Sequence, residues 1–274
     1  MEKETIHKKN LIDRLPKRGK VLWSDEFDTD GLPDNDEWSF DVGISQSSRD
    51  LQIYTDTNAY VQDDCLVIET RKEQEPNELN PQLRYTSSRL VSKRTFKYGI
   101  FEARIRVTRS RFVWPAFWLR SFDDNNFYYD DDLFLNKNNY KNINECSNYL
   151  KASIYCNLIN SNDIMISNMD ENNKYNERIY EICKCRFCST QSFHIYTIDW
   201  NKDRIKFYVD QHEYFSYRRQ ESNLYGETSW PFDSDMNIVF NTFVRGKWPL
   251  NKVYDERPFP SYAFIDYVRY YESL

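Results

Sequence analysis

Glycine and proline are scarce in this chain, which has six glycines and nine prolines among 274 residues. Turns therefore depend mainly on the abundant Asn and Asp residues, which tolerate left-handed backbone. The sequence also lacks internal repeats and Pro/Ser-rich linkers, so nothing in it divides the chain into separate domains. We expect one domain whose elements are joined by many short loops.

Long apolar runs and an excess of basic charge are missing as well. No stretch of about 20 consecutive apolar residues occurs, and residues 1–20 carry charge without an apolar segment, so we expect neither a membrane span nor a signal peptide. The formal net charge is −6, whereas a nucleic-acid surface needs a basic stripe. The sequence therefore predicts no nucleic-acid or membrane partner, and favours the cytoplasm or a virion over secretion.

Apolar residues are plentiful, at 40% of the chain with aromatic residues at 17%, which is enough material for a core along its whole length. Apolar or alternating runs bounded by turn residues predict strands, and no amphipathic helix of comparable strength competes with them. The predicted strands are residues 20–27, 59–70, 85–91, 96–107, 113–119, 193–200, 204–209, 237–243 and 263–270. Because βα alternation is absent, the pattern favours an all-β sandwich of two antiparallel sheets.

The predicted organisation has three parts. Residues 1–19 form a charged N-terminal extension, and residues 20–274 form the sandwich domain. Within that domain, residues at about 123–190 are predicted to form an irregular, polar, cysteine-bearing insertion.

Five of the six cysteines lie in the predicted insertion. Cys183, Cys185 and Cys188 follow a C-x-C-x2-C spacing, and Cys156 or Cys146 is available as a fourth thiolate for a tetrahedral zinc site. The alternatives are free cysteines or, in an oxidising compartment, disulfides that close a long loop.

Several segments carry a family signature in a fixed order. Those in the N-terminal half are VLWSDEF at 21–27, LQIYTDTNA at 51–59, YTSSRL at 85–90, FKYGIFEAR at 96–104 and WPAFWL at 114–119. Those in the C-terminal half are FHIYTIDW at 193–200, FYVD at 207–210, NTFVRGKW at 241–248 and IDYVRY at 265–270. In these segments the chain resembles the laminarinases of glycoside hydrolase family 16. The resemblance implies a concanavalin-like jelly roll of two bent sheets, with a groove for a β-glucan chain on its concave face.

Candidate ligand-binding residues lie in these segments. Trp114 and Trp118 share one face of a predicted strand, and sugar C–H faces pack well on indole, although the alternative is that both fill the core. Arg89 and Asn58 resemble groove residues of the family that bind sugar hydroxyls. Without the resemblance, Arg89 would be interpreted as part of a surface ion pair and Asn58 as a turn residue. Asn241 interrupts an apolar strand, and a buried amide must find partners in protein, water or ligand.

The catalytic motif departs from the family pattern. Retaining glycosidases use two carboxyl groups about 5–5.5 Å apart, and the resemblance implies that they lie on one strand as Glu-x-Asp-x-x-Glu. Here Asp130 matches the nucleophile, Asp132 the middle aspartate and Leu135 the acid/base. Aspartate is shorter than glutamate by one methylene, and leucine transfers no proton. No shift of the alignment repairs the motif, because no glutamate occurs between Glu102 and Glu145.

Metal binding is a further question at two places. The resemblance implies calcium on the convex side, where Glu26, Gly43 and Asp266 match the family positions. The three carboxylates at 130–132 are either a remnant of the active site, a calcium site or a solvated acidic turn. No cofactor is expected to be required.

The leading hypothesis is a family 16 homologue that has lost glucanase activity. It would act as a carbohydrate-binding pseudoenzyme or an interaction scaffold, with a β-glucan, another polysaccharide or a protein as its partner. One alternative is an active endo-β-1,3-glucanase with Asp130 as nucleophile and a carboxylate of the insertion, such as Glu145, as proton donor. Another is a structural or host-interaction protein with a zinc-bound cysteine cluster.

Overall fold

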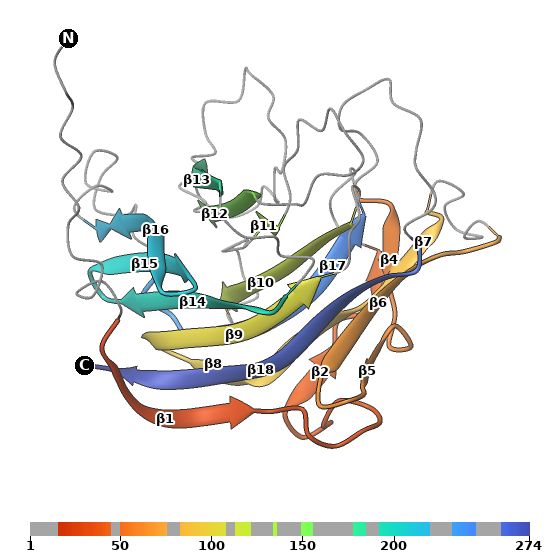
Figure 1. The fold of residues 1–274 in the computed structure, drawn as a ribbon, viewed down its shortest axis with the longest axis horizontal. Helices are drawn as coiled ribbons and strands as arrows, with labels where there is room; N and C mark the ends of the chain where they lie inside the picture. Colours follow the sequence, from red (N-terminus) through yellow and green to blue (C-terminus); the bar gives the residue numbers. More distant parts are fainter. Residues whose placement is uncertain are drawn as a thin grey trace, which may run out of the picture.

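The computed structural model describes residues 16–44, 50–75, 83–107, 113–121, 134–135, 149–155, 178–184, 192–219, 232–244 and 259–274. Its described elements are β-strands in three sheets (Figure 1). Among the described strand pairs all are antiparallel except β4 with β7. The prediction of an all-β sandwich is confirmed, with this one parallel pair as an addition.

The large sheet has eleven strands. In spatial order its path is β16 (His212–Arg218), β15 (Arg204–Val209), β14 (His194–Asn201), β9 (Gly99–Val107), β18 (Ser261–Ser273), β6 (Leu66–Lys72), β7 (Tyr85–Ser87), β4 (Gln52–Tyr54) and β3 (Gly43–Ile44). Two further strands join it at the side: β1 (Arg18–Asp25) pairs with β18, and β5 (Ala59–Val61) pairs with β6. β1 therefore begins two residues inside the predicted extension.

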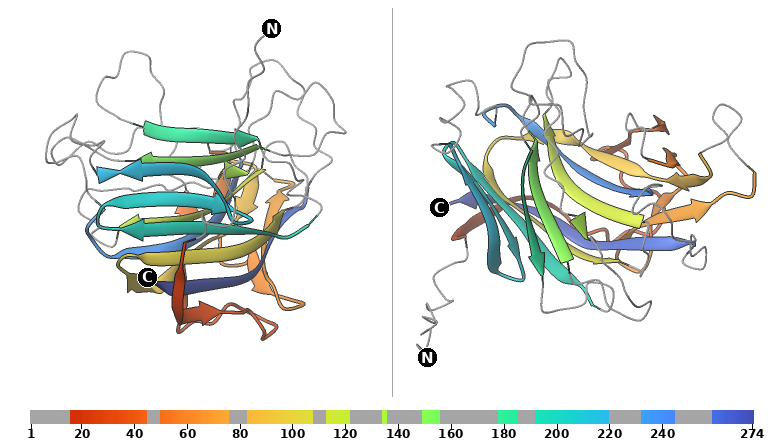
Figure 2. Two further views of the ribbon diagram at one scale, coloured as in Figure 1. Left: turned by 60° about the vertical axis from the view of Figure 1, so that its left-hand side comes forward. Right: turned by 90° about the horizontal axis from the view of Figure 1, so that it is seen from above.

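The second layer is a four-stranded sheet in the order β10 (Val113–Ser121), β17 (Met236–Val244), β8 (Arg89–Phe96) and β2 (Trp38–Phe40). A small third sheet contains β11 (Phe134–Leu135), β12 (Tyr149–Tyr155) and β13 (Arg178–Lys184). β11 lies against β10, so the small sheet continues from the edge of the four-stranded sheet (Figure 2). The prediction that residues 123–190 are irregular is wrong at these three strands. Short period-two runs such as YLKASIY at 149–155 went unrecognised among Asn-rich surroundings.

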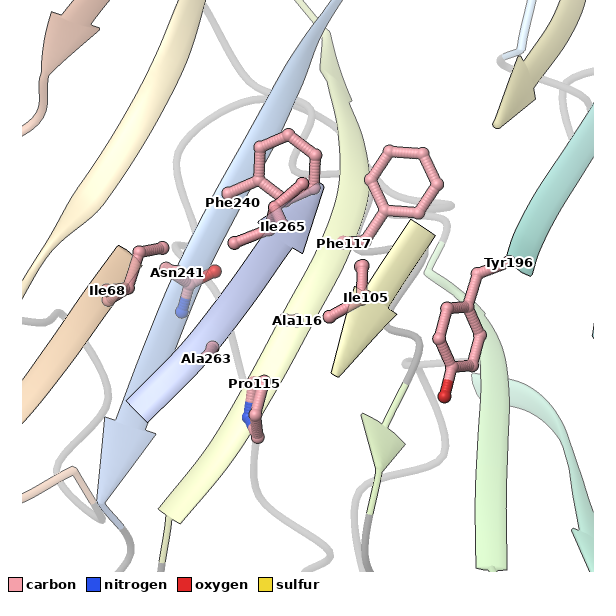
Figure 3. A pocket seen from close by; sticks show the side chains of 10 residues that line it. All are labelled: Ile68, Ile105, Pro115, Ala116, Phe117, Tyr196, Phe240, Asn241, Ala263 and Ile265. Carbon is pink, nitrogen blue, oxygen red and sulfur yellow. The ribbon is translucent and has the colours of Figure 1, made fainter. Parts of the chain in front are cut away.

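The inter-sheet core is built from large aromatic side chains of both layers. Phe117 and Phe240 stack with ring centroids 5.2 Å apart, and Trp38 packs against Phe240 at 5.8 Å. The cavity in this core (Figure 3) measures about 10 Å³, which is room for about one water molecule. This cavity is too small for a sugar.

Two predicted strands are each divided by a tight turn. Residues 59–70 form β5 and β6, because Asp63 and Asp64 adopt left-handed backbone with φ of 52° and 56°. Residues 96–107 are divided where β8 ends, since Gly99 has φ of 109°. A Cβ on Gly99 would lie 2.4 Å from the Tyr270 ring and 2.8 Å from the Tyr271 carbonyl oxygen, so this turn requires glycine.

The segment VLWSDEF ends in a turn fixed by one carboxylate. Asp25 Oδ1 accepts a hydrogen bond from the Phe27 backbone N–H at 2.9 Å, and Asp25 Oδ2 accepts one from Trp38 Nε1 at 2.7 Å. Phe27 takes a φ of 49° in this turn. The role of Asp25 in the described structure is therefore to join β1 to the strand that carries Trp38.

Among the described residues there is no helix with the length and apolar character needed to cross a membrane.

Candidate functional site

The four-stranded sheet has one face on the inter-sheet core and one turned away from it, which we call the far face. Phe117 and Leu119 of β10 point into the core, whereas Trp114, Ala116 and Trp118 belong to a separate apolar cluster with residues of β8 and β17. The alternation along β10 therefore places both tryptophans on the far face, as predicted. Neither tryptophan belongs to the inter-sheet core.

A chain of hydrogen bonds crosses the far face through Asn241 on β17. Trp118 Nε1 donates to Asn241 Oδ1 at 2.7 Å, and Asn241 Nδ2 donates to the Tyr54 hydroxyl at 3.0 Å. Asn241 and Tyr54 are 4% and 2% exposed, so these contacts answer the requirement that a buried amide be bonded. Asn241 thus positions Trp118 and Tyr54, and two of its amide atoms are already engaged within the protein.

Tyr54 reaches this place because its strand is attached to the end of β17. Gln52 Oε1 accepts a hydrogen bond from the Val244 backbone N–H at 2.7 Å, and the Leu51 N–H donates to the Val244 carbonyl oxygen at 2.8 Å. Burial, followed by the nearby Asp50 carboxylate, raises the pKa of the Tyr54 hydroxyl well above its ordinary value. Tyr54 therefore stays neutral and serves as a fixed hydrogen-bonding partner.

Arg89, Asp41 and Arg120 form a second group on the far face, which we call the Arg–Asp–Arg triad. Asp41 Oδ2 lies 3.0 Å from Arg89 Nη2 and 2.7 Å from Arg120 Nη1. Because β17 and β8 lie between β10 and the segment after β2, the Arg120 side chain reaches across both strands. The Arg89 guanidinium also lies over the Tyr54 ring, 4.6 Å from its centroid, which joins the triad to the hydrogen-bond chain.

The triad is partly open to solvent, with 21% of the Arg89 side chain, 24% of Arg120 and 31% of Asp41 exposed. Burial raises the pKa of the Asp41 carboxyl, but the charges and hydrogen bonds of Arg89 and Arg120 outweigh burial and hold it below its ordinary value. Asp41 is therefore ionised, and the three side chains together carry one net positive charge.

Asn58 lies apart from these residues. It is 1% exposed, its Nδ2 donates to the Glu69 carbonyl oxygen at 2.9 Å and to Thr86 Oγ1 at 3.2 Å, and its Oδ1 accepts from Thr55 Oγ1 at 2.5 Å. These contacts hold the turn before β5 against β6 and β7. Contact of Asn58 with a sugar stays a prediction that these internal bonds do not favour.

The predicted catalytic positions are only partly described. Asp130 and Asp132 lie outside the described residues, whereas Leu135 is in β11. Its backbone pairs with Leu150 of β12, and β11 lies against β10, the strand that carries Trp114 and Trp118. Leu135, which the sequence matches to the acid/base position, is therefore on a strand next to the tryptophan-bearing strand, and its catalytic assignment stays a prediction.

The predicted metal sites differ in what the structure shows of them. Cys183 lies in β13, whereas Cys156, Cys185 and Cys188 are outside the described residues. Zinc therefore stays a prediction.

At the predicted calcium positions, both Glu26 carboxylate oxygens accept hydrogen bonds from Arg269, at 2.9 and 2.7 Å. Asp266 accepts one from Arg104 at 2.6 Å, and Gly43 has a φ of 118°. Within the described ranges no group of three or more His, Cys, Asp or Glu side chains is placed to hold a metal ion. Guanidinium groups thus already neutralise both carboxylates, and calcium here stays a prediction.

Sequence reasoning missed Tyr54, Asp41 and Arg120. For Arg120 a signal exists, because it continues the alternation of Trp114, Ala116 and Trp118 along the same strand. Asp41 and Tyr54 give no comparable local signal. Their positions depend on pairing between segments far apart in the chain, as in the hydrogen bond from the Asp41 N–H to the Arg89 carbonyl oxygen at 2.9 Å.

Comparison with known proteins gives concordant matches. The model of the family described as Glycosyl hydrolases family 16 matches residues 47–149 and 157–256. The Beta-glucanase of Rhodothermus marinus is 31% identical over 270 residues, which cover 94% of this chain and 87% of that protein. The solved laminarinase from Rhodothermus marinus superposes with a TM-score of 0.73 at 28% identity, covering 95% of this chain and 100% of the other. For the laminarinase catalytic domain from Thermotoga maritima the TM-score is 0.72 at 26% identity, with 94% and 100% covered. The similarity extends over nearly the whole chain.

Proposed function

The chain belongs to glycosyl hydrolases family 16, and we propose that it is a member in which β-glucan hydrolysis is impaired while carbohydrate binding is kept. The observation that carries the proposal is the sequence match of Leu135 to the acid/base position of the family motif, together with its place in β11, a strand beside β10. Of the proteins named above, one is a beta-glucanase and two are laminarinases, and they suggest a β-glucan as the ligand.

The chemical argument concerns proton transfer. Leucine neither protonates the leaving oxygen nor activates water, and such help is typically worth about 10²–10⁴-fold in rate. Aspartate at position 130 retracts the attacking oxygen by roughly 1.5 Å, and a displacement of about 1 Å is enough to slow a reaction about 10²-fold. Both residues take part in both steps of the double displacement, the nucleophile as attacking and then leaving carboxylate and the other residue as acid and then base, so both changes reduce turnover.

Binding is supported by the far face. Trp114 offers partly exposed indole surface, and Arg89 and Arg120 are partly exposed on the same face. An aromatic surface with a few fixed polar groups suits a carbohydrate better than a flat protein interface. We therefore prefer a carbohydrate ligand to a role as a protein scaffold.

The test combines binding and turnover on laminarin. Wild-type protein should bind laminarin, measured by affinity electrophoresis, without releasing reducing ends in a sensitive assay. The double variant Asp130→Glu/Leu135→Glu restores the Glu-x-Asp-x-x-Glu pattern and should gain turnover, whereas Leu135→Met, which keeps size and polarity similar, should gain none. Turnover by the wild type that Asp130→Ala abolishes would contradict impaired hydrolysis and favour an active glucanase with a proton donor such as Glu145.

A further inference from the structure

Most polar groups in the middle of the far face are already bonded to one another. Trp118 Nε1 donates to Asn241, and Asn241 in turn donates to Tyr54, all three side chains being at most 6% exposed. These hydrogen bonds fix the three side chains in place and leave them few donors or acceptors for a ligand. Recognition of a ligand by hydrogen bonds therefore depends on the neighbouring Arg–Asp–Arg triad.

Hydrogen-bond donors exceed acceptors in the triad. Each guanidinium has five N–H groups, yet Arg89 and Arg120 direct one nitrogen each to the same oxygen, Asp41 Oδ2. Arg89 Nε is buried and has no hydrogen-bond partner within the part of the chain that the structure describes. A buried N–H without a partner calls for an explanation, and an acceptor brought by a ligand is one.

The net charge of the triad also favours a ligand that brings acceptor oxygens. Two guanidinium groups face one carboxylate, which leaves one positive charge on a surface whose side chains are one fifth to one third exposed. Asp50, whose charge acts on Tyr54, is 9% exposed and has contacts of its own. Guanidinium groups pair most strongly with planar or tetrahedral oxyanions, in which several acceptor oxygens match the fork of donors.

We propose that Arg89 and Arg120 bind an acidic substituent, a carboxylate or a sulfate ester, on the polysaccharide that this protein recognises. The proposal rests on the carbohydrate binding proposed above and narrows its ligand to an acidic glycan. The partly exposed Trp114 contacts the sugar rings, and the two arginines select the charged group.

The experiment compares one glucan in neutral and acidic forms. Binding of laminarin, and of the same laminarin carboxymethylated or sulfated at low density, is measured by isothermal titration calorimetry on the full chain. The net charge of −6 repels polyanions at long range, so the salt concentration is set at about 0.15 M, where the Debye length is about 8 Å.

The expected result is tighter binding of the acidic forms, by roughly tenfold, which is the lower end for hydrogen bonds to charged groups. Arg120→Gln should remove most of this preference, so that the acidic and neutral forms of laminarin bind with similar affinity. The matched control is Arg106→Gln, which removes an arginine from the large sheet, where its guanidinium lies 4.2 Å from the Phe264 ring centroid. This variant has the same charge as Arg120→Gln and should keep the preference.

Three outcomes overturn the proposal. Equal binding of neutral and acidic laminarin by the wild type refutes it while leaving the proposed function intact. A preference for acidic laminarin that survives in Arg120→Gln shows that the acidic group does not bind at the triad. The same follows if Arg106→Gln reduces the preference as much as Arg120→Gln does. Absence of binding to all forms of laminarin contradicts the carbohydrate-binding function as well.

Discussion

Arginines and aromatic rings occur on both outer surfaces of the sandwich, but the arginines are paired with carboxylates differently on the two surfaces. On the outer surface of the large sheet, Arg269 pairs with Glu26 and Arg104 pairs with Asp266, one carboxylate to each of these arginines. Arg269 also lies over the Tyr267 ring, 3.8 Å from its centroid. On the far face two arginines share a single carboxylate oxygen. In the one-to-one pairs each charge is neutralised within the protein. The triad instead leaves one net positive charge and N–H donors for a ligand.

The carboxylates that pair with arginines differ in burial. Glu102 of β9 is 1% exposed, accepts a hydrogen bond from the Tyr267 hydroxyl at 3.0 Å and pairs with Arg18 Nη2 at 2.5 Å. The carboxylate of the triad is far more accessible to water, with 31% of the Asp41 side chain exposed. The loss of a carboxylate should therefore cost more stability at Glu102 than at Asp41.

The largest effect is expected from Glu102→Ala, which removes the buried acceptor of the Tyr267 hydroxyl and the partner of Arg18, whose side chain is 30% exposed. Leaving a buried hydroxyl without its acceptor costs about 1–3 kcal/mol of the free energy of unfolding. Asp41→Ala should cost about 1 kcal/mol or less, because the triad is partly solvated and its pairs are screened. Urea denaturation of both variants measures the difference.

Glu26→Ala is the control for this comparison, because its carboxylate is also paired with an arginine but is 44% exposed. Its loss should resemble that of Asp41→Ala. If all three variants lose the same stability, burial of the carboxylate does not set the cost of its loss.

A smaller effect is expected when one aromatic ring is removed from each surface. Trp114→Ala should weaken laminarin binding by up to about tenfold, since stacking contacts of aromatic rings are worth roughly 0.5–1.5 kcal/mol beyond the area they bury. Phe264→Ala removes a ring from the large sheet that lies beside Tyr262 and under Arg106. Laminarin binding by Phe264→Ala should be unchanged. Equal losses in titrations of the two variants would mean that the far face is not the carbohydrate-binding surface.

How far the sequence predicts these surfaces depends on the range of the interactions involved. The two tryptophans were placed on a common face by alternation alone, and Arg120 follows the same rule. The turn at Asp63 and Asp64 was missed within a predicted strand, because its flanks are apolar on both sides and only the backbone angles reveal the reversal. Asx residues with left-handed backbone are nevertheless what the shortage of glycine leads one to expect.

Contacts between distant segments were beyond the sequence. Nothing local indicates that Asp41 receives arginines from β8 and β10, or that Tyr54 bonds an amide 187 positions away. Asn241 was recognised as a buried amide in need of partners, but whether protein or ligand supplied them depended on the packing of β4 against β17. Candidate residues were therefore predictable, whereas their division into ligand contacts and positioning residues was not.

The smallest effects concern the pH dependence of stability. The contributions of Asp41 on the far face and Asp199 on the large sheet should change with pH in opposite directions. The pKa of Asp41 is lowered in the folded protein, so its contribution to stability is present above about pH 4 and is lost as pH falls through the lowered value. Burial raises the pKa of Asp199 on the large sheet despite Arg204, so stability declines as pH rises from about 4 through the raised value. Asp41→Asn should therefore lower the melting temperature more at about pH 7 than at about pH 3, by roughly 2 °C, whereas Asp199→Asn should compare more favourably with the wild type at the higher pH. Differential scanning calorimetry of the three proteins at both pH values measures this. A pH response of the same sign in both variants would contradict the contrast, because it would place the Asp41 carboxylate in surroundings dominated by burial and leave the two arginines without an ionised partner to share.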